Sequence, residues 1–184
     1  MADPAPDNPF WDFTLAVYRG EGVSQACIEL QDRLGLDVNF LLLAVFAGSR
    51  GFAIAAPQWE RLEALARPWR ENVIHPLRGV RRWLKTQMAL PAPVIDPMRR
   101  AVLAQEIESE GMQQRLMWTA LAIPAGEPSL QRGAGNLAAY CGFAKARLSA
   151  EDLDALGTVL SQALAPTTRE IARAALAEAI PAAG

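Results

Sequence analysis

The sequence contains a single histidine, His75, and only two cysteines, Cys27 and Cys141. Neither cysteine belongs to a CxxC pair or to a cluster with histidine. The usual four-ligand structural zinc site is therefore excluded, and we predict no metal and no cofactor. We expect two buried, reduced thiols; a disulfide stays open as the alternative, because sequence spacing does not give geometry.

Motifs of catalysis and of membrane insertion are also missing. The sequence has no Gly-rich phosphate loop, no GxSxG and no HExxH, so an enzymatic activity is left open and no catalytic residue is predicted. The apolar run at residues 40–47 is too short to span a bilayer. The N-terminal MADPAPDNP lacks the basic and apolar regions of a signal peptide, so we expect a cytoplasmic protein.

Neither sign of charge is in large excess: the net charge is −2, so the chain as a whole does not attract nucleic acid or anionic lipid. What is abundant is Ala and Leu, in a chain that is 51% hydrophobic, and these residues favour helix over strand. No strand-like alternation is visible. We predict an all-α fold, a compact helical bundle with a short C-terminal helical appendage and no sheet.

Residues 37–51 form the stretch around which the bundle is expected to assemble. Residues 40–47 include no polar side chain. A helix that is apolar on every face is surrounded by protein, so we predict a buried central helix at 38–47, with Asp37 as its N-cap. The preceding segment, 23–34, has one clean apolar stripe, and Gly35 is placed to end it in a left-handed conformation.

A second regular pattern runs through residues 59–84, where apolar residues recur every three or four positions. Pro68 and Pro76 interrupt it, so we expect a break near Arg67 and a kink or second break near His75. Residues 89–96 are expected to be an extended linker. Asp96 and Pro97 fit the cap and first position of a long helix that continues to about residue 122.

Composition divides the chain into four parts. We predict a disordered tail at 1–8, a helical core domain of five or six helices at 9–122, a Gly- and Pro-rich loop at 123–135, and a C-terminal helical extension at 136–184. The core domain is expected to fold without the extension. The alternative is that the helix at 97–122 needs cover from leucines of the extension.

Three blocks of sequence resemble a known family. FWDF at 10–13, GVSQACIELQDRLGLDVNFLLL at 22–43 and PWRENVIHPLRGVRRWLK at 68–85 are similar to short proteobacterial proteins that share a conserved domain of unknown function. The resemblance covers roughly residues 9–120, and the chain from about Gly133 resembles an extension. It implies a bacterial cytosolic protein and brings no reaction, cofactor or catalytic residue.

The best candidate for a functional surface is basic. Residues 67–85 hold six basic residues and one acidic residue, a formal charge of +5. Helical spacing places four of these side chains on one face, with Trp83 beside them; the predicted partner-binding residues are Arg78, Arg81, Arg82, Trp83 and Lys85. The alternative is a solvated face paired with acidic residues of the next long helix, Glu106, Glu108 and Glu110.

Two further candidates are weaker. His75 is a general base only if it has a partner, and we expect a hydrogen-bonded structural histidine. Glu106 and Glu110 lie one helical turn apart, which suits acid–base or metal chemistry; because no matching histidine or second acidic pair is present, we expect salt bridges to the basic residues. We therefore expect a non-enzymatic protein-binding module or adaptor that recognises an acidic protein segment. A small-ligand-binding protein or enzyme with an apolar pocket is the alternative, and nucleic-acid or phosphate binding comes third; the oligomeric state stays open.

Overall fold

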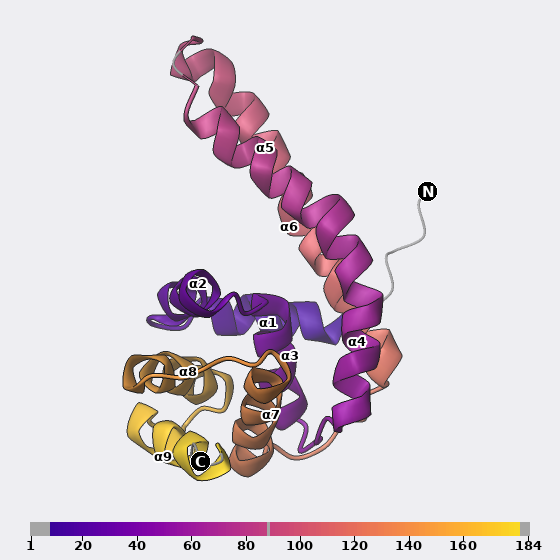
Figure 1. Ribbon diagram of the computed structural model, residues 1–184, viewed down its shortest axis with the longest axis vertical. Coiled ribbons are helices and arrows are strands. Elements are labelled where there is room, and N and C mark those ends of the chain that lie inside the picture. The colour runs from indigo at the N-terminus through magenta and orange to yellow at the C-terminus, as the bar shows by residue number, and fades with distance from the viewer. Residues whose placement is uncertain (1–7, 88, 181–184) are drawn as a thin grey trace.

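The computed structural model describes residues 8–87 and 89–180, and in these two ranges it contains helices and no strand. Most of the predicted tail at 1–8 therefore lies outside the described residues. The prediction of an all-α fold is confirmed (Figure 1). In chain order the helices are α1 Pro9–Tyr18, α2 Val23–Leu34, α3 Val38–Gly48, α4 Ala56–Trp69, the π-helical segment η1 Arg70–Ile74, α5 His75–Lys85, α6 Ala92–Leu121, α7 Leu130–Phe143, α8 Ala150–Ala163 and α9 Arg169–Ala179.

Helix α3 is the centre of the body of the molecule, as predicted. Every residue from Asn39 to Gly48 is buried. The helix begins where the Asp37 side chain accepts a hydrogen bond from the backbone N–H of Asn39, at 2.8 Å. Gly35 ends α2 with a φ of 67°, a left-handed conformation that glycine adopts without steric cost. Both caps were therefore readable from the sequence.

The C-terminal helices share the hydrophobic core of α3. Leu137 of α7, Leu156 and Leu160 of α8 and Leu176 of α9 are all completely buried and belong to the same cluster as the side chains of α3. Helices α3 and α7 cross at two glycines: a Cβ added at Gly48 would lie 2.7 Å from the backbone nitrogen of Gly133. The division into a core domain and an extension remains a prediction. Because the C-terminal helices share the core of α3, we now expect the two parts to unfold as one cooperative unit.

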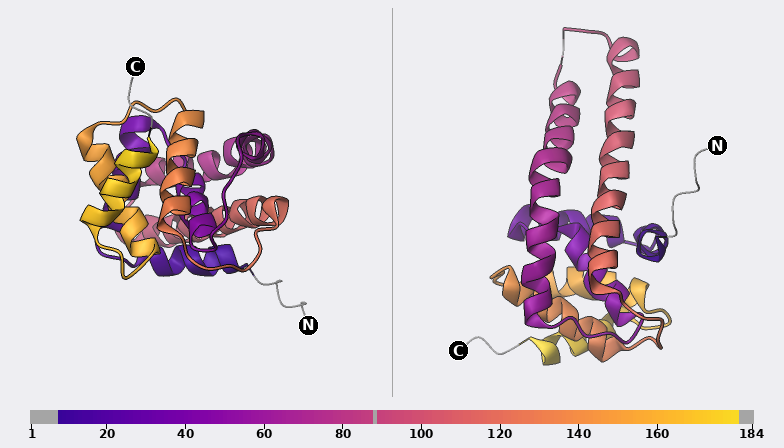
Figure 2. Two further views of the ribbon diagram at one scale, coloured as in Figure 1. Left: turned by 90° about the horizontal axis from the view of Figure 1, so that it is seen from below. Right: turned by 90° about the vertical axis from the view of Figure 1, so that its right-hand side faces the viewer.

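A long helical hairpin extends away from the body. Helices α4, η1 and α5 follow one another without interruption, and α6 returns antiparallel beside them (Figure 2). Within the described residues, the backbone of α5 packs only against α6 and η1, and its Arg78 side chain reaches α2. We call residues 75–104, the outer half of this hairpin, the arm. At 1.5 Å per residue, the 30 residues of α6 span about 45 Å.

The predicted break near Arg67 is wrong, and near His75 the helix changes geometry without breaking. Pro68 lies inside α4 without ending it. At the second proline the chain changes to π-helical geometry, in which the N–H of His75 bonds to the carbonyl of Arg70, five residues back. The wider turn takes up an additional residue beside Pro76, whose ring nitrogen cannot donate, so the helix continues where a break was expected.

The predicted linker at 89–96 and the predicted helix start at Asp96 are also wrong. Helix α6 begins at Ala92, and Pro97 lies within it. Pro93 and Pro97 are both exposed, so water can reach the carbonyl group that the missing N–H of Pro97 leaves without a helical partner. The rule that proline ends a helix failed here because it assumes that the carbonyl group left without a partner is buried.

Candidate functional site

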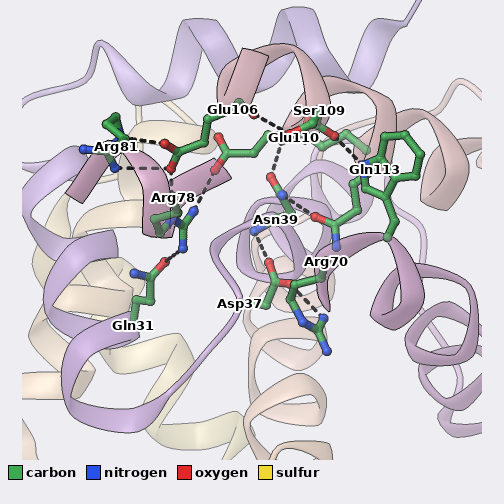
Figure 3. Close-up of polar contacts among 12 residues, drawn as sticks. Gln31, Asp37, Asn39, Arg70, Arg78, Arg81, Glu106, Ser109, Glu110 and Gln113 are labelled. Carbon is green, nitrogen blue, oxygen red and sulfur yellow. Dashed lines mark hydrogen bonds and ion pairs between the residues drawn. The ribbon is translucent and has the colours of Figure 1, made fainter. Parts of the chain in front are cut away.

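The structure divides the predicted basic face into two groups. Arg78 and Arg81 point inward, across the hairpin, to one carboxylate of α6 (Figure 3). The Nε atom of Arg78 donates to Oε1 of Glu106 at 2.9 Å, and Arg81 donates to both oxygens of the same carboxylate. The Glu106 side chain is only 5% exposed. These two arginines therefore hold the helices of the hairpin together, as the pairing alternative predicted.

The charge of Glu106 is stabilised by its partners. Burial alone would raise the pKa of its carboxyl group, but the hydrogen bonds and positive charges of Arg81 and Arg78 outweigh burial and hold the pKa below its ordinary value. The carboxyl group of Glu106 is therefore ionised at neutral pH, and the arginines that contact it are not available to a partner molecule.

Glu110, one turn further along α6, has the opposite shift. Its Oε1 accepts a hydrogen bond from Nη2 of Arg78 at 2.8 Å. Burial, aided by the nearby negative charge of Glu106, nevertheless raises the pKa of Glu110 above its ordinary value. Arg78 also reaches α2, where it donates to the Gln31 side chain at 3.3 Å. Arg78 thus connects three helices at the foot of the arm.

The second group of the predicted face is free. Arg82, Trp83 and Lys85 are exposed, and neither cation has a hydrogen bond or ion pair among the described residues. Trp83 is 60% exposed. On the facing helix Arg100 is likewise exposed and unpaired within the described part of the chain, whereas Arg99 pairs with Asp96 at 2.8 Å. The arm holds six basic residues and one acidic residue, a formal charge of +5.

Large apolar side chains are exposed on the same arm. Val80 and Trp83 are three residues apart on α5, and Val94 and Met98 are four apart on α6, so each pair shares a helix face. Their exposed fractions are 42% for Val80, 60% for Trp83, 60% for Val94 and 56% for Met98. Clustered exposed apolar residues mark interaction surfaces more often than scattered ones. Only the proximity of Trp83 to basic residues was visible in the sequence.

A large open cleft lies at the foot of the arm, between the hairpin and the body. Its volume is about 990 Å³. It is lined by residues from α1 to α7, the π-helical segment included, and by the turn between α2 and α3. The cleft is the second candidate site, and the charged residues of its walls are Arg67, Arg70, Arg78, Arg82, Asp32, Asp37, Glu63 and Glu110.

A chain of buried hydrogen bonds forms the floor of the cleft. The Thr14 hydroxyl donates to Gln114 at 3.0 Å, the Gln114 amide donates to Asn39 at 2.7 Å, and the Asn39 amide donates to Gln113 at 2.6 Å. All four residues are buried. Sequence reasoning missed this network, although Asn39 was visible as a polar residue at the start of an otherwise apolar helix.

An ion pair lies beside this floor. Arg70 donates to Asp37 at 2.9 Å and to the two oxygens of Glu63 at 2.6 and 3.2 Å. The cap of α3 is thereby connected to α4, because the other oxygen of Asp37 caps that helix. The hydroxyl of Tyr140 accepts a hydrogen bond from the backbone N–H of Asp37 at 2.8 Å, which brings α7 to the same point.

The remaining predicted residues give no reacting group. His75 lines the cleft, but it is exposed and its imidazole makes no hydrogen bond to the described residues, so the expectation of a hydrogen-bonded structural histidine is wrong. Cys27 and Cys141 are free and buried, and burial raises the pKa of each thiol to about 12. The described residues hold no cluster of three metal-binding side chains. In the same part of the chain, no helix is long and apolar enough to cross a bilayer.

The chain belongs to the family described as "Protein of unknown function (DUF2390)", whose family model matches residues 9–117. The match begins at the first residue of α1 and ends inside α6, so it includes the central helix, the arm and most of the residues that line the cleft. Helices α7 to α9 lie beyond it. No curated protein and no solved structure gives a significant match.

Proposed function

We propose that this family member is a non-enzymatic protein-binding module whose arm recognises an acidic segment of a partner protein. The observation that supports the proposal is the arm itself, two helices whose outer part projects away from the body (Figure 1). The arm exposes unpaired cations and large apolar side chains. Arg82, Lys85 and Arg100 supply the charge. Trp83 supplies the apolar contact, and Trp and Arg are among the residues that contribute most to binding at protein interfaces.

The distribution of charge favours an acidic partner. The whole chain has a net charge of −2 and the arm has +5, so the remainder has −7. An acidic segment is therefore attracted to the arm and repelled by the body, which orients the encounter. Arg78 and Arg81 are left out of the proposed contact surface, because Glu106 already binds them.

The apolar side chains of the arm restrict the partner further. A partner that is only acidic would leave Val80, Trp83, Val94 and Met98 exposed. A segment with both carboxylates and apolar residues covers them and gains free energy from apolar burial. The proposal includes the bacterial cytosol as the location, which suits two reduced, buried thiols.

The test is charge reversal on the arm with a matched change on the body. In Arg82→Glu/Lys85→Glu/Arg100→Glu, three exposed, unpaired cations become anions. The control, Arg132→Glu/Lys145→Glu/Arg147→Glu, makes the same change of net charge on exposed residues in and after α7. We expect the arm variant to lose its partner and the control to retain it, with similar melting temperatures for both.

Other classes of partner are outcomes of the same test. The unmodified protein is also presented with vesicles of anionic lipid and with duplex DNA. The proposal is contradicted if the unmodified protein binds vesicles or DNA, the arm variant does not, and no acidic protein segment binds the arm. Equal loss of the partner in both triple variants would show that only net charge matters.

The alternative of a small-ligand-binding protein is favoured by a different observation, the cleft at the foot of the arm. The two sites meet at Arg82, because the cleft is lined by residues of the body, of the lower hairpin and of α5 from His75 to Arg82, whereas Trp83, Lys85 and Arg100 do not line it.

A further inference from the structure

We propose that the cleft at the foot of the arm binds a small organic acid, a carboxylate attached to an apolar body. This inference goes beyond binding by the arm; it shares Arg82 with the proposed arm surface and otherwise rests on different residues. The cleft measures about 990 Å³, at the upper end of the range typical for small-molecule sites. Three properties of its lining define the ligand: unused hydrogen-bond donors, engaged carboxylates and an apolar wall.

Hydrogen-bond donors are in excess in the cleft. Arg82 has no partner among the described residues, and Arg67 uses only its Nε atom, which donates to Glu63 at 3.0 Å. Each buried amide of the floor has two N–H groups. Asn39, Gln113 and Gln114 each donate one hydrogen bond within the protein, but Gln113 is 0% and Gln114 is 1% exposed, so the donors that a ligand reaches are chiefly those of Arg82 and Arg67.

Acceptors, by contrast, are mostly occupied. Both oxygens of Asp37 and both oxygens of Glu63 accept hydrogen bonds within the protein. Glu110 uses one oxygen for Arg78. Asp32 has no hydrogen bond or ion pair among the described residues, and it is exposed near the end of α2. A ligand that brings acceptors therefore finds partners in this cleft, and a ligand that brings donors finds few.

The cleft also has apolar lining. Trp11 and Leu15 of α1 and Ile107 of α6 line the cleft. Leu15 is 40% exposed and Ile107 is 43% exposed, so both have apolar surface that a ligand can cover. An inorganic anion would leave this surface in contact with water. The arrangement therefore fits an acid whose apolar part lies on α1 and α6 while its carboxylate meets Arg82.

Gly79 allows the cleft to be closed without damage to the fold. It lies on α5, lines the cleft and is exposed, and a Cβ added there meets no atom within 4 Å. Leucine is also a better helix former than glycine. Gly79→Leu should therefore occupy the cleft and keep α5 helical. Gly135 of α7 is equally open but does not line the cleft, so Gly135→Leu is the matched control.

The experiment titrates the full-length protein with two acids, decanoate and 3-phenylpropanoate, and with their neutral analogues, decan-1-ol and 3-phenylpropan-1-ol, by isothermal titration calorimetry. Inorganic phosphate is the third probe. We expect at least one acid to bind with a Kd at least tenfold below that of its alcohol, and phosphate to show no saturable binding. Gly79→Leu should weaken acid binding at least tenfold, and Gly135→Leu should leave it unchanged.

Arg82→Gln tests the charge separately, because Arg82 is exposed and unpaired within the described residues and its replacement should not affect folding. It should weaken acid binding about tenfold and leave alcohol binding unchanged. The proposal is overturned if neither acid binds below 1 mM, if the alcohols bind as well as the acids, or if Gly79→Leu binds like the unmodified protein. Because Gly79→Leu retains Arg82, Lys85 and Arg100, binding of a protein partner to this variant reports on the arm independently.

Discussion

Arg78 and Glu106 join the two helices of the hairpin: Nε of the arginine donates to Oε1 of the glutamate at 2.9 Å, and the carboxylate is 5% exposed. This ion pair separates the basic residues of the arm that stabilise the fold from those that are available for binding. A cation that neutralises a buried carboxylate is part of the fold, whereas the exposed cations at 82, 85 and 100 are free for a partner.

The first prediction concerns the stability of the hairpin. Glu106→Gln removes the charge on which Arg78 and Arg81 converge, so Arg81 loses its counter-ion and Arg78 keeps only Glu110. We expect the free energy of unfolding to fall by about 1.5–3 kcal/mol, the range for hydrogen bonds to charged groups. Urea denaturation measures it. Glu108→Gln, on an exposed residue of the same helix, should change the value by no more than about 0.5 kcal/mol.

A second prediction follows from the opposite pKa shifts of Glu106 and Glu110. The pKa of Glu106 is lowered on folding, so its contribution is present above the unfolded value of 4.5 and is lost as the pH falls below it. The pKa of Glu110 is raised on folding, so its contribution is largest below 4.5 and is lost as the pH rises through its folded pKa.

The two carboxyl groups therefore oppose each other on acidification. Unfolding free energies measured between pH 3 and 7 should decline less steeply toward low pH in Glu106→Gln than in the unmodified protein. They should decline more steeply in Glu110→Gln. The same slope in all three proteins would contradict this assignment of the shifts.

A third prediction tests the crossing of α3 and α7. A methyl group at Gly48 would collide with the backbone of Gly133, where no side chain can rotate away. We expect Gly48→Ala to lower the free energy of unfolding by about 1–3 kcal/mol, as overpacking does in other cores. Gly135→Ala, whose Cβ meets nothing within 4 Å, should be neutral or slightly stabilising. A neutral Gly48→Ala would mean that the two helices are further apart.

The fourth prediction concerns the C-terminal helices. A chain ending at Gly126 loses α7, α8 and α9, and with them Leu137, Leu156 and Leu160, which are completely buried in the shared core. We expect the truncated protein to lose its cooperative thermal transition in circular dichroism. A sharp transition near that of the full chain would show instead that residues 9–122 form an independent domain.

The sequence predicted those features that depend on local chemistry. The apolar run of α3 implied burial, and the caps at Asp37 and Gly35 follow from side chains and backbone preferences a few residues away. For Arg78 the sequence indicated both partner binding and pairing within the protein, since Glu106 and Glu110 lie one helical turn apart. Choosing between them required the position of α6 relative to α5, which no local pattern contains.

The features that escaped prediction depend on long-range geometry or on solvent. The π-helical turn before Pro76 and the tolerance of Pro97 in α6 depend on whether a carbonyl group is buried, and the sequence does not report this. The hydrogen-bond chain from Thr14 to Gln113 joins residues about 100 positions apart. The projection of the arm was hidden for the same reason, because its helices look no different from those of the body.

The most direct test of the central claim is site-specific cross-linking at the arm. A photoreactive phenylalanine analogue replaces Trp83, which is 60% exposed, and in a second protein it replaces Ile171 of α9, which is 53% exposed on the body. Both proteins are irradiated in cells of the source organism, and cross-linked peptides are identified by mass spectrometry. The account predicts that position 83 gives a discrete adduct whose partner segment contains carboxylates and apolar residues, and that position 171 does not. Adducts at position 83 with basic segments, or no adducts beyond those at position 171, would contradict it.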